Sequence, residues 1–235
     1  MPTMSNRLRE WARHSQPDLL RIAWLARYEL SSVWIDLRGR CTPRQRALLK
    51  RLKQEKGLKL HFASGPYKRD GWINVDGAAE ADVQLDLRRP FPFATESVRL
   101  IFAEHFLDHL QFPDVVGRFL SECHRVLEPS GRIRLVLHDA ELLAKAYLAR
   151  DQEFFRLALN SQPPFAESVN ELFRHNGFHQ FIYDFETLEL VLRRAGFTTV
   201  LRSSCAASEI PELNLDWNDP HRSVQSLYVE AIKAS

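Results

Sequence analysis

The feature of this sequence that most constrains its fold is an alternation of β-type and helical segments that begins after Gly57. Apolar runs rich in β-branched residues predict strands, and longer runs with apolar residues at helical spacing predict helices. We expect strands at 58–62, 72–76, 82–87, 98–104, 132–139, 198–204 and 226–233, and helices within 113–131, 141–160 and 184–197, with a looser segment at 161–183. This order predicts an α/β fold: a doubly wound, mostly parallel sheet with helices on both faces, which binds ligands beyond the carboxyl ends of its strands.

Residues 1–57 form a separate piece with a different charge. They hold 13 Lys and Arg residues against 5 Asp and Glu, a net charge of +8, whereas the remainder holds 19 against 25, a net charge of −6. Helical spacing predicts one helix within 17–30 and a second that Thr42 and Gln45 would open with a capping box. We therefore divide the chain into a basic helical appendage and a main domain, 58–235.

The basic charge of the appendage has two interpretations. Amphipathic helices often carry a solvated basic face, and a basic surface can also contact an anionic substrate, nucleic acid or a membrane. The sequence holds no aromatic-interleaved RNA motif, zinc finger or helix-turn-helix signature, so nucleic acid is not an expected partner.

The sequence also bears on compartment. No apolar run approaches the length needed to cross a bilayer, and charges occupy the N-terminal positions where a signal peptide has its apolar segment. Cys41, Cys123 and Cys205 form no CxxC pair and leave one cysteine over, which is typical of reduced thiols. We expect a cytoplasmic protein and assign the cysteines no chemistry.

Five segments of the main domain carry a family resemblance. They are LHFASGP, GWINVD, DLRRPFPF, IFAEHFLDHL and CHRVLEPSGRIRLVL, in that order. Together they resemble the class I S-adenosylmethionine-dependent methyltransferases, and most of all a small bacterial branch with GWINVD and EHxLEHL-type motifs. The resemblance runs from about Leu58 to Lys233 and implies a Rossmann-like sheet that binds S-adenosyl-L-methionine.

The loop after the first strand is the expected site for the cofactor's carboxylate. A turn that lets backbone N–H groups approach an anion needs small residues, and Phe62 is followed by Ala63, Ser64 and Gly65. The family pattern has glycine at the first of these positions. The methyl group of Ala63 is tolerable there if φ is negative and obstructive if φ is positive.

Acidic residues at the next strand ends complete the expected cofactor site. Asp76 can accept hydrogen bonds from both ribose hydroxyls, and the resemblance places Asp86 at the adenine amine with Leu87 beside the ring. Glu104 is expected to help hold the cationic cofactor. Two alternatives remain: Asp76 can be an exposed acid in a structural turn, and Asp86 can be a helix cap or an ion-pair partner for the arginines that follow it.

Histidines are the expected catalytic residues. A hydroxyl acceptor must lose a proton, and an imidazole at the end of a strand can accept it near neutral pH. We expect His105 to be the base, with His138 in reserve; either can equally be a hydrogen-bonded packing residue. The side chains expected to face the acceptor are His109, Arg174, His175, His179 and Tyr183, unless those in the loop only solvate it.

The predicted function is methyl transfer to a small-molecule or saccharide acceptor, with O-methylation implied by the resemblance alone. A second hypothesis is a non-catalytic binding or scaffold protein with the same fold, since the loop lacks its first glycine. A third comes from HFLDH, residues 105–109, which places two histidines at helical spacing beside Asp108 like an inverted zinc-protease motif. Because no third ligand is evident from the sequence, we expect no metal.

Overall fold

The computed structural model describes residues 26, 29–30, 33–35, 37–39 and 41–235. Within them lies a seven-stranded sheet in the order β3-β2-β1-β4-β5-β7-β6. The strands are β1 (Leu58–Phe62), β2 (Ile73–Asp76), β3 (Val83–Gln84), β4 (Val98–Glu104), β5 (Leu127–His138), β6 (Thr199–Ser203) and β7 (Ser226–Ile232). The first five pair in parallel, and β7 is antiparallel to both of its neighbours. The predicted Rossmann-like, mostly parallel sheet is confirmed.

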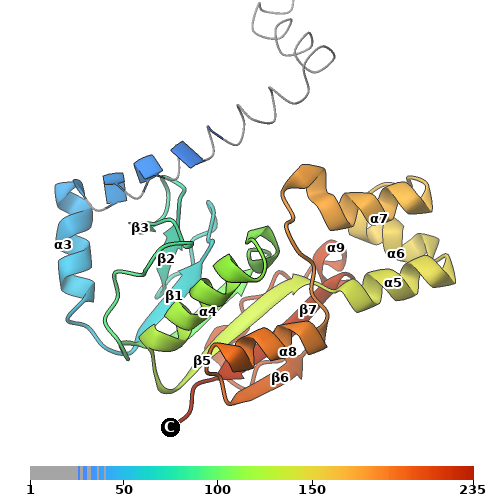
Figure 1. The fold of residues 1–235 in the computed structure, drawn as a ribbon. Coiled ribbons are helices and arrows are strands. Elements are labelled where there is room, and N and C mark those ends of the chain that lie inside the picture. Colours follow the sequence, from blue (N-terminus) through green and yellow to red (C-terminus); the bar gives the residue numbers. More distant parts are fainter. Residues whose placement is uncertain (1–25, 27–28, 31–32, 36, 40) are drawn as a thin grey trace, which may run out of the picture.

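Helices cover the sheet unevenly. They are α3 (Pro43–Leu52), α4 (Asp114–Val126), α5 (Ala140–Ala149), α6 (Gln152–Leu159), α7 (Phe165–Arg174), α8 (Phe185–Arg194) and the short α9 (Pro220–Ser223). Figure 1 shows α4 and α8 side by side on one face, while α5, α6 and α7 pack together as a separate group beyond the strands. Leu52 of α3 joins the same core as α4 and α8, so this helix contributes to the packing of the main domain.

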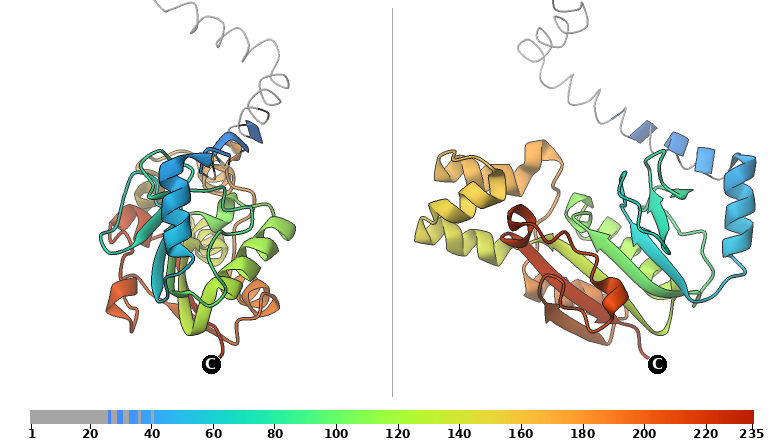
Figure 2. Two further views of the ribbon diagram at one scale, coloured as in Figure 1. Left: turned by 90° about the vertical axis from the view of Figure 1, so that its left-hand side faces the viewer. Right: turned by 180° about the vertical axis from the view of Figure 1, so that it is seen from behind.

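The opposite face of the sheet differs from the prediction of helices on both sides. Segment 204–219 covers it, with Leu213 of the 3₁₀ turn η3 (Pro211–Leu213) packed against Trp72, Phe102 and Tyr228; Figure 2 shows this face from behind. The connections between β1, β2 and β3 are too short to hold a full crossover helix, because a βαβ connection normally takes at least about 10–12 residues.

A buried arginine attaches segment 204–219 to the sheet. Arg134 of β5 is fully buried, and its guanidinium donates hydrogen bonds to Asp216, at 2.8 Å, and to Glu230 of β7, at 2.8 Å. A third bond, of 2.7 Å, goes to the carbonyl of Ser204. Asp216 and Ser204 belong to the covering segment, so the Arg134 side chain holds this segment against the sheet.

The local predictions succeed where the apolar pattern is long. Helix α4 buries the face expected of it: Val115, Val116, Phe119, Leu120, Cys123 and Val126. Asp184 caps α8 by accepting a hydrogen bond from the backbone N–H of Thr187, as expected. Among the described residues no helix is long and apolar enough to span a bilayer.

Other local predictions are wrong, each for a local reason. The Thr42 side chain makes no cap bond to α3, and the backbone N–H of Thr42, which a capping box directs to the Gln45 side chain, donates to the carbonyl of Arg38 instead. The helix expected over 141–160 is broken at Arg150, whose φ of 52° is left-handed, and α6 begins again at the Asp151 cap.

The loose segment expected at 161–183 contains α7, while the strand expected at 82–87 is reduced to β3. The helix expected within 17–30 lies mostly outside the described residues, and the domain boundary at residue 57 stays a prediction.

Candidate functional site

Two cavities lie at the edge where the parallel strands end. We call the first the carboxylate cavity; it has a volume of about 370 Å³ and is lined by Ala63, Asp76, Asp86, Leu87, Phe106 and His109, among others. The second, the histidine cavity, has a volume of about 590 Å³ and is lined by His105, His109, His138, His175, His179 and His221, with Glu167, Glu171 and Arg222. Since His109 lines both, the cavities adjoin at this side chain. Both volumes fall in the range usual for small-molecule sites.

The loop after β1 is held by the carboxylate of Asp76. The backbone N–H of Gly65 donates to Asp76 Oδ2 at 2.9 Å, and that of Ala78 donates to Oδ1 at 2.8 Å. Asp76 therefore lines the carboxylate cavity in a fixed orientation, and each oxygen keeps a lone pair for another donor. The Ser64 hydroxyl in this loop is buried and has no hydrogen-bond partner among the residues that the structure describes.

Ala63 adopts the conformation in which its methyl group is unfavourable. Its φ is 53°, in the left-handed region that glycine enters freely and that costs other residues about 1–2 kcal/mol. The loop thus keeps the backbone shape of the glycine pattern without the first glycine.

Asp86 lines the carboxylate cavity and forms the ion pair that the alternative hypothesis predicted. Arg88 Nε donates to its two carboxylate oxygens at 3.0 and 3.3 Å, and the same guanidinium reaches Glu29 at 2.7 Å. The side chain still lines the carboxylate cavity next to Leu87. A ligand there would contact an acid whose charge Arg88 already balances.

Four of the expected cofactor residues do not line the carboxylate cavity: Phe62, Ser64, Gly65 and Glu104. Phe62 is fully buried between Phe91 and Phe119, with ring centroids 5.0 and 5.8 Å away. Glu104 faces the segment before β7, where it accepts hydrogen bonds from Arg222 at 3.1 Å and from the backbone of Trp217 at 3.3 Å. Burial raises the pKa of Glu104 despite the neighbouring arginine.

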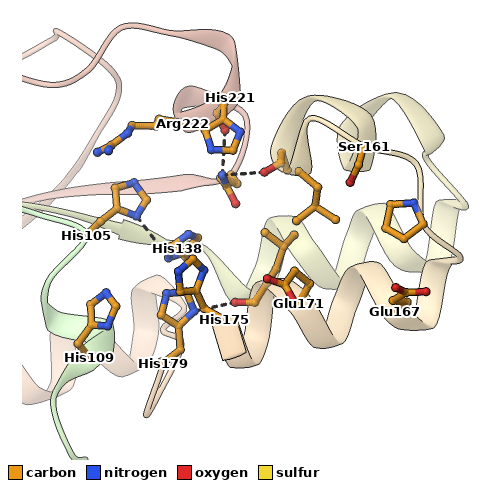
Figure 3. Close-up of a pocket in the computed structure, with 15 residues that line it drawn as sticks. His105, His109, His138, Ser161, Glu167, Glu171, His175, His179, His221 and Arg222 are labelled. Atoms are coloured by element: carbon orange, nitrogen blue, oxygen red, sulfur yellow. Dashed lines mark hydrogen bonds between the residues drawn. The ribbon is translucent and has the colours of Figure 1, made fainter. Parts of the chain in front are cut away.

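The histidine cavity brings together side chains from four parts of the chain. Figure 3 shows His105 and His109 after β4, His138 at the end of β5, His175 and His179 after α7, and His221 and Arg222 on α9. At its floor, His138 Nδ1 lies 2.5 Å from Asp108 Oδ2 and 3.3 Å from His105 Nδ1. His105 has a φ of 49°, so a strained backbone directs it out of β4.

Burial controls the protonation of this floor. It lowers the pKa of His105 to about 3, helped by the charge of His138, and lowers that of His179 to about 4. Burial alone would raise the pKa of Asp108, but the hydrogen bond from His138 and the charges of the surrounding histidines together outweigh it, and the pKa is lowered. The floor at neutral pH therefore holds one carboxylate and neutral imidazoles at His105 and His179.

Three of the five residues expected to face the acceptor line the histidine cavity, and two do not. His109, His175 and His179 line the histidine cavity, whereas Arg174 is exposed and does not. Tyr183 also does not line it, because the side chain is fully buried beside Phe112 and Phe181.

Sequence reasoning did not single out four ionisable residues that line the histidine cavity: Glu167, Glu171, His221 and Arg222. The two glutamates lie on α7, inside a segment predicted to be a loop. The other two lie on the four-residue α9, which has no periodic pattern to reveal it.

Comparison with known proteins gives one family match and a set of similar folds. Residues 40–135 match the model of a family described as a methyltransferase domain. None of the curated proteins matches the chain.

Among solved structures, the chain is similar to one in the complex between the Haloferax volcanii Trm112 methyltransferase activator and the putative methyltransferase, with 15% identity, 85% of this chain and 92% of that chain covered, and a TM-score of 0.49. It is similar to an S-adenosylmethionine-dependent methyltransferase from Archaeoglobus fulgidus, with 18% identity, 81% and 91% covered, and a TM-score of 0.45. It is also similar to Haemonchus contortus phosphoethanolamine N-methyltransferase 2 in complex with S-adenosyl-L-methionine, with 12% identity, 97% and 60% covered, and a TM-score of 0.47.

Proposed function

We propose that this protein is an S-adenosylmethionine-dependent methyltransferase that binds its cofactor in the carboxylate cavity and its acceptor in the histidine cavity. The observation that carries the proposal is the meeting of the two cavities at His109, at the carboxyl edge of the sheet. Parallel α/β sheets bind ligands at this edge where the strand order reverses, which here is between β1 and β4. The match of residues 40–135 to a methyltransferase domain supports the same cofactor.

The residues of the carboxylate cavity fit this cofactor. Asp76 would accept hydrogen bonds from the ribose hydroxyls, since its oxygens keep lone pairs beyond the two backbone N–H groups that orient it. The buried Ser64 hydroxyl of the adjoining loop, which has no hydrogen-bond partner among the described residues, would donate to the cofactor's carboxylate. Asp86 and Leu87 would border the adenine. The cofactor supplies an electrophilic methyl group next to the histidine cavity.

The floor of the histidine cavity would handle the acceptor's proton. Methyl transfer is an in-line displacement, so most of the acceleration must come from orientation, and a hydroxyl acceptor also has a proton to lose. A pKa of about 3 makes His105 a weak base. His138 is the stronger choice, because Asp108 accepts the hydrogen bond from its Nδ1 and stabilises the imidazolium that forms.

The walls of the histidine cavity favour a small polyhydroxylated acceptor. Glu167 and Glu171 offer carboxylate acceptors along α7, and His175 and His221 can donate or accept hydrogen bonds. A glycan-type acceptor methylated on oxygen matches this mixture of groups.

Transfer of a labelled methyl group tests the function. The full chain is incubated with methyl-labelled S-adenosylmethionine and a panel of sugar nucleotides and phenolic metabolites. We expect label in an acceptor with the wild type, a rate at sub-saturating cofactor lowered about 10- to 100-fold with Asp76→Ala, and a rate lowered roughly 10²- to 10⁴-fold with His138→Ala. Transfer that Asp76→Ala leaves intact would refute the proposed cofactor site.

Two observations favour the scaffold alternative. Ala63 replaces glycine at a left-handed position of the loop expected to bind the cofactor's carboxylate, and the Asp86 carboxylate, expected to contact the adenine, is already paired with Arg88. A partner-binding protein with this fold would bind no nucleoside. Failure of both wild type and Ala63→Gly to bind S-adenosylhomocysteine at millimolar concentration would favour this alternative.

A further inference from the structure

We infer that His105, Asp108 and His138 form a binding site for a divalent transition metal ion of the zinc type, at the floor of the histidine cavity. The three ligand atoms, two imidazole nitrogens and one carboxylate oxygen, all lie within 4.8 Å of one another. The HFLDH segment supplies two of them, and β5 supplies the third ligand that the sequence did not reveal.

The spacing of the ligand atoms suits a tetrahedral ion. Zinc bonds of about 2.0–2.1 Å at the tetrahedral angle place ligand atoms about 3.3 Å apart. His105 Nδ1 and His138 Nδ1 are 3.3 Å apart. Asp108 Oδ2 lies 2.5 Å from His138 Nδ1, a hydrogen-bond distance that would widen once an ion replaced the shared proton.

The hydrogen bond made by Nε2 of His105 leaves Nδ1, the nitrogen that faces His138, without a proton. Ser226 Oγ donates its hydrogen to the carbonyl of Arg222 at 2.7 Å, so His105 Nε2, 3.2 Å away, must be the donor to that oxygen. The lone pair of a neutral His105 therefore lies on Nδ1 and faces His138. Metal-binding histidines are characteristically oriented by such a second hydrogen bond.

A fourth side chain repeats this pattern. His179 Nδ1 donates to the carbonyl of Leu172 at 2.8 Å, which leaves the lone pair on Nε2, 3.8 Å from Asp108 Oδ2. The point between these side chains is therefore surrounded by electron pairs, from His105 Nδ1, His179 Nε2 and the Asp108 carboxylate. The hydrogen that these tautomers direct toward it is the proton on His138 Nδ1. His179 is near enough to become a fourth ligand, or to border an open position on the cavity side.

The carboxylate also lacks the partners that a buried charge needs. Asp108 is 0% exposed, and its Oδ1 has no hydrogen-bond partner among the described residues. Among the described residues, the hydrogen bond from His138 to Oδ2 is the compensation that this carboxylate has. A divalent cation would supply the missing compensation, because buried charges are normally paired or bound to metal.

The donor set indicates the class of metal. Imidazole with one carboxylate suits zinc, iron, cobalt or nickel, whereas magnesium and calcium prefer oxygen ligands. The ion would bind His138 Nδ1, and the proton of the neutral ring would move to Nε2, so that His138 could no longer act as the base. The ion would take over that role, since a bound metal lowers the pKa of a coordinated hydroxyl. Only this catalytic role rests on the proposed function; the binding of the ion does not.

Direct metal titration tests the inference. Untagged full-length protein is freed of metal with a chelator and titrated with Zn²⁺ by calorimetry in buffers of different ionisation enthalpy, and with Co²⁺ by visible spectroscopy. We expect one equivalent of tight binding and a Co²⁺ spectrum of tetrahedral or five-coordinate type.

Variants assign the ligands. We expect Asp108→Asn and His138→Ala to lose the tight Zn²⁺ site, while His175→Ala, in the same cavity, and His124→Ala, on α4, keep it. Thermal unfolding and S-adenosylhomocysteine titration of each variant report whether fold and cofactor site survive, so a failure of the metal site is separate from a failure of the methyltransferase proposal. Absence of saturable Zn²⁺ binding in the wild type, or binding unchanged in folded Asp108→Asn and His138→Ala, would overturn the inference.

Discussion

At the scale of single residues, the conformation of Ala63 has a measurable cost. Its left-handed backbone is one that glycine adopts without penalty. We predict that Ala63→Gly raises the free energy of unfolding by about 1 kcal/mol, because relief of this strain exceeds the extra entropy of a glycine in the unfolded chain. Urea denaturation of both proteins measures the difference; a variant less stable than the wild type would show that the methyl group packs favourably.

A second residue links stability to pH. His61 is buried and donates through Nδ1 to Asn74 Oδ1 at 3.0 Å, and burial lowers the pKa of His61 below its ordinary 6.5. Below about pH 6.5 the unfolded chain therefore binds a proton that the folded chain does not, and His61 destabilises the fold as pH falls. The contribution has a slope of at most about 1.4 kcal/mol per pH unit.

Replacement of this imidazole isolates its effect. We predict that His61→Gln loses less stability than the wild type between pH 7 and pH 5, measured by urea unfolding at each pH. Parallel stability curves for the two proteins would show that other groups cause the whole acid loss.

Strand ends explain which site residues could be predicted from the sequence. Asp76, His105 and His138 each end or directly follow a parallel strand, so the strand prediction alone brings them to one edge of the sheet. Arg174 and Tyr183 were assigned by their place in a segment read as a loop. That inference fails because α7 and the aromatic core around Phe181, not the chain order, decide which way they face.

At the scale of elements, the strand pattern is readable because buried parallel strands are continuous apolar runs. The break between α5 and α6 cannot be read from the sequence, since Arg150 has no intrinsic preference for the left-handed conformation that separates the two helices. Nor does local pattern reveal that segment 204–219 covers one face of the sheet, because the contacts that hold it are long-range ion pairs.

The Arg134 cluster provides the test at this scale. We predict that Arg134→Met lowers the free energy of unfolding by about 3–5 kcal/mol, because Asp216 is left buried without its arginine and Glu230 keeps only its ion pair with Arg132 among the described residues. The matched control is Arg99→Met, which removes a half-exposed bridge to Glu212 and should cost at most about 1 kcal/mol. Equal losses in the two variants, measured by urea denaturation, would contradict this account of the covering segment.

At the scale of the whole molecule, the arrangement that matters is two cavities at one sheet edge. The carboxylate cavity is built mainly from the first half of the chain and could be anticipated from its motifs. The histidine cavity needs β4, β5, α7 and α9 together, so only the assembled fold brings Asp108 beside His138 and His221 beside the same cavity. Cofactor chemistry was therefore predictable from the sequence and acceptor chemistry was not.

Calorimetric titration of the full chain with S-adenosylhomocysteine tests the central claim, that Asp76 belongs to a cofactor site. We predict saturable binding of one equivalent by the wild type and by the exposed control Asp70→Ala. Asp76→Ala should bind about 10- to 100-fold more weakly, since hydrogen bonds to a charged group contribute about 1.5–3 kcal/mol. Absence of binding in the wild type, or equal affinity in Asp76→Ala and Asp70→Ala, would contradict the account.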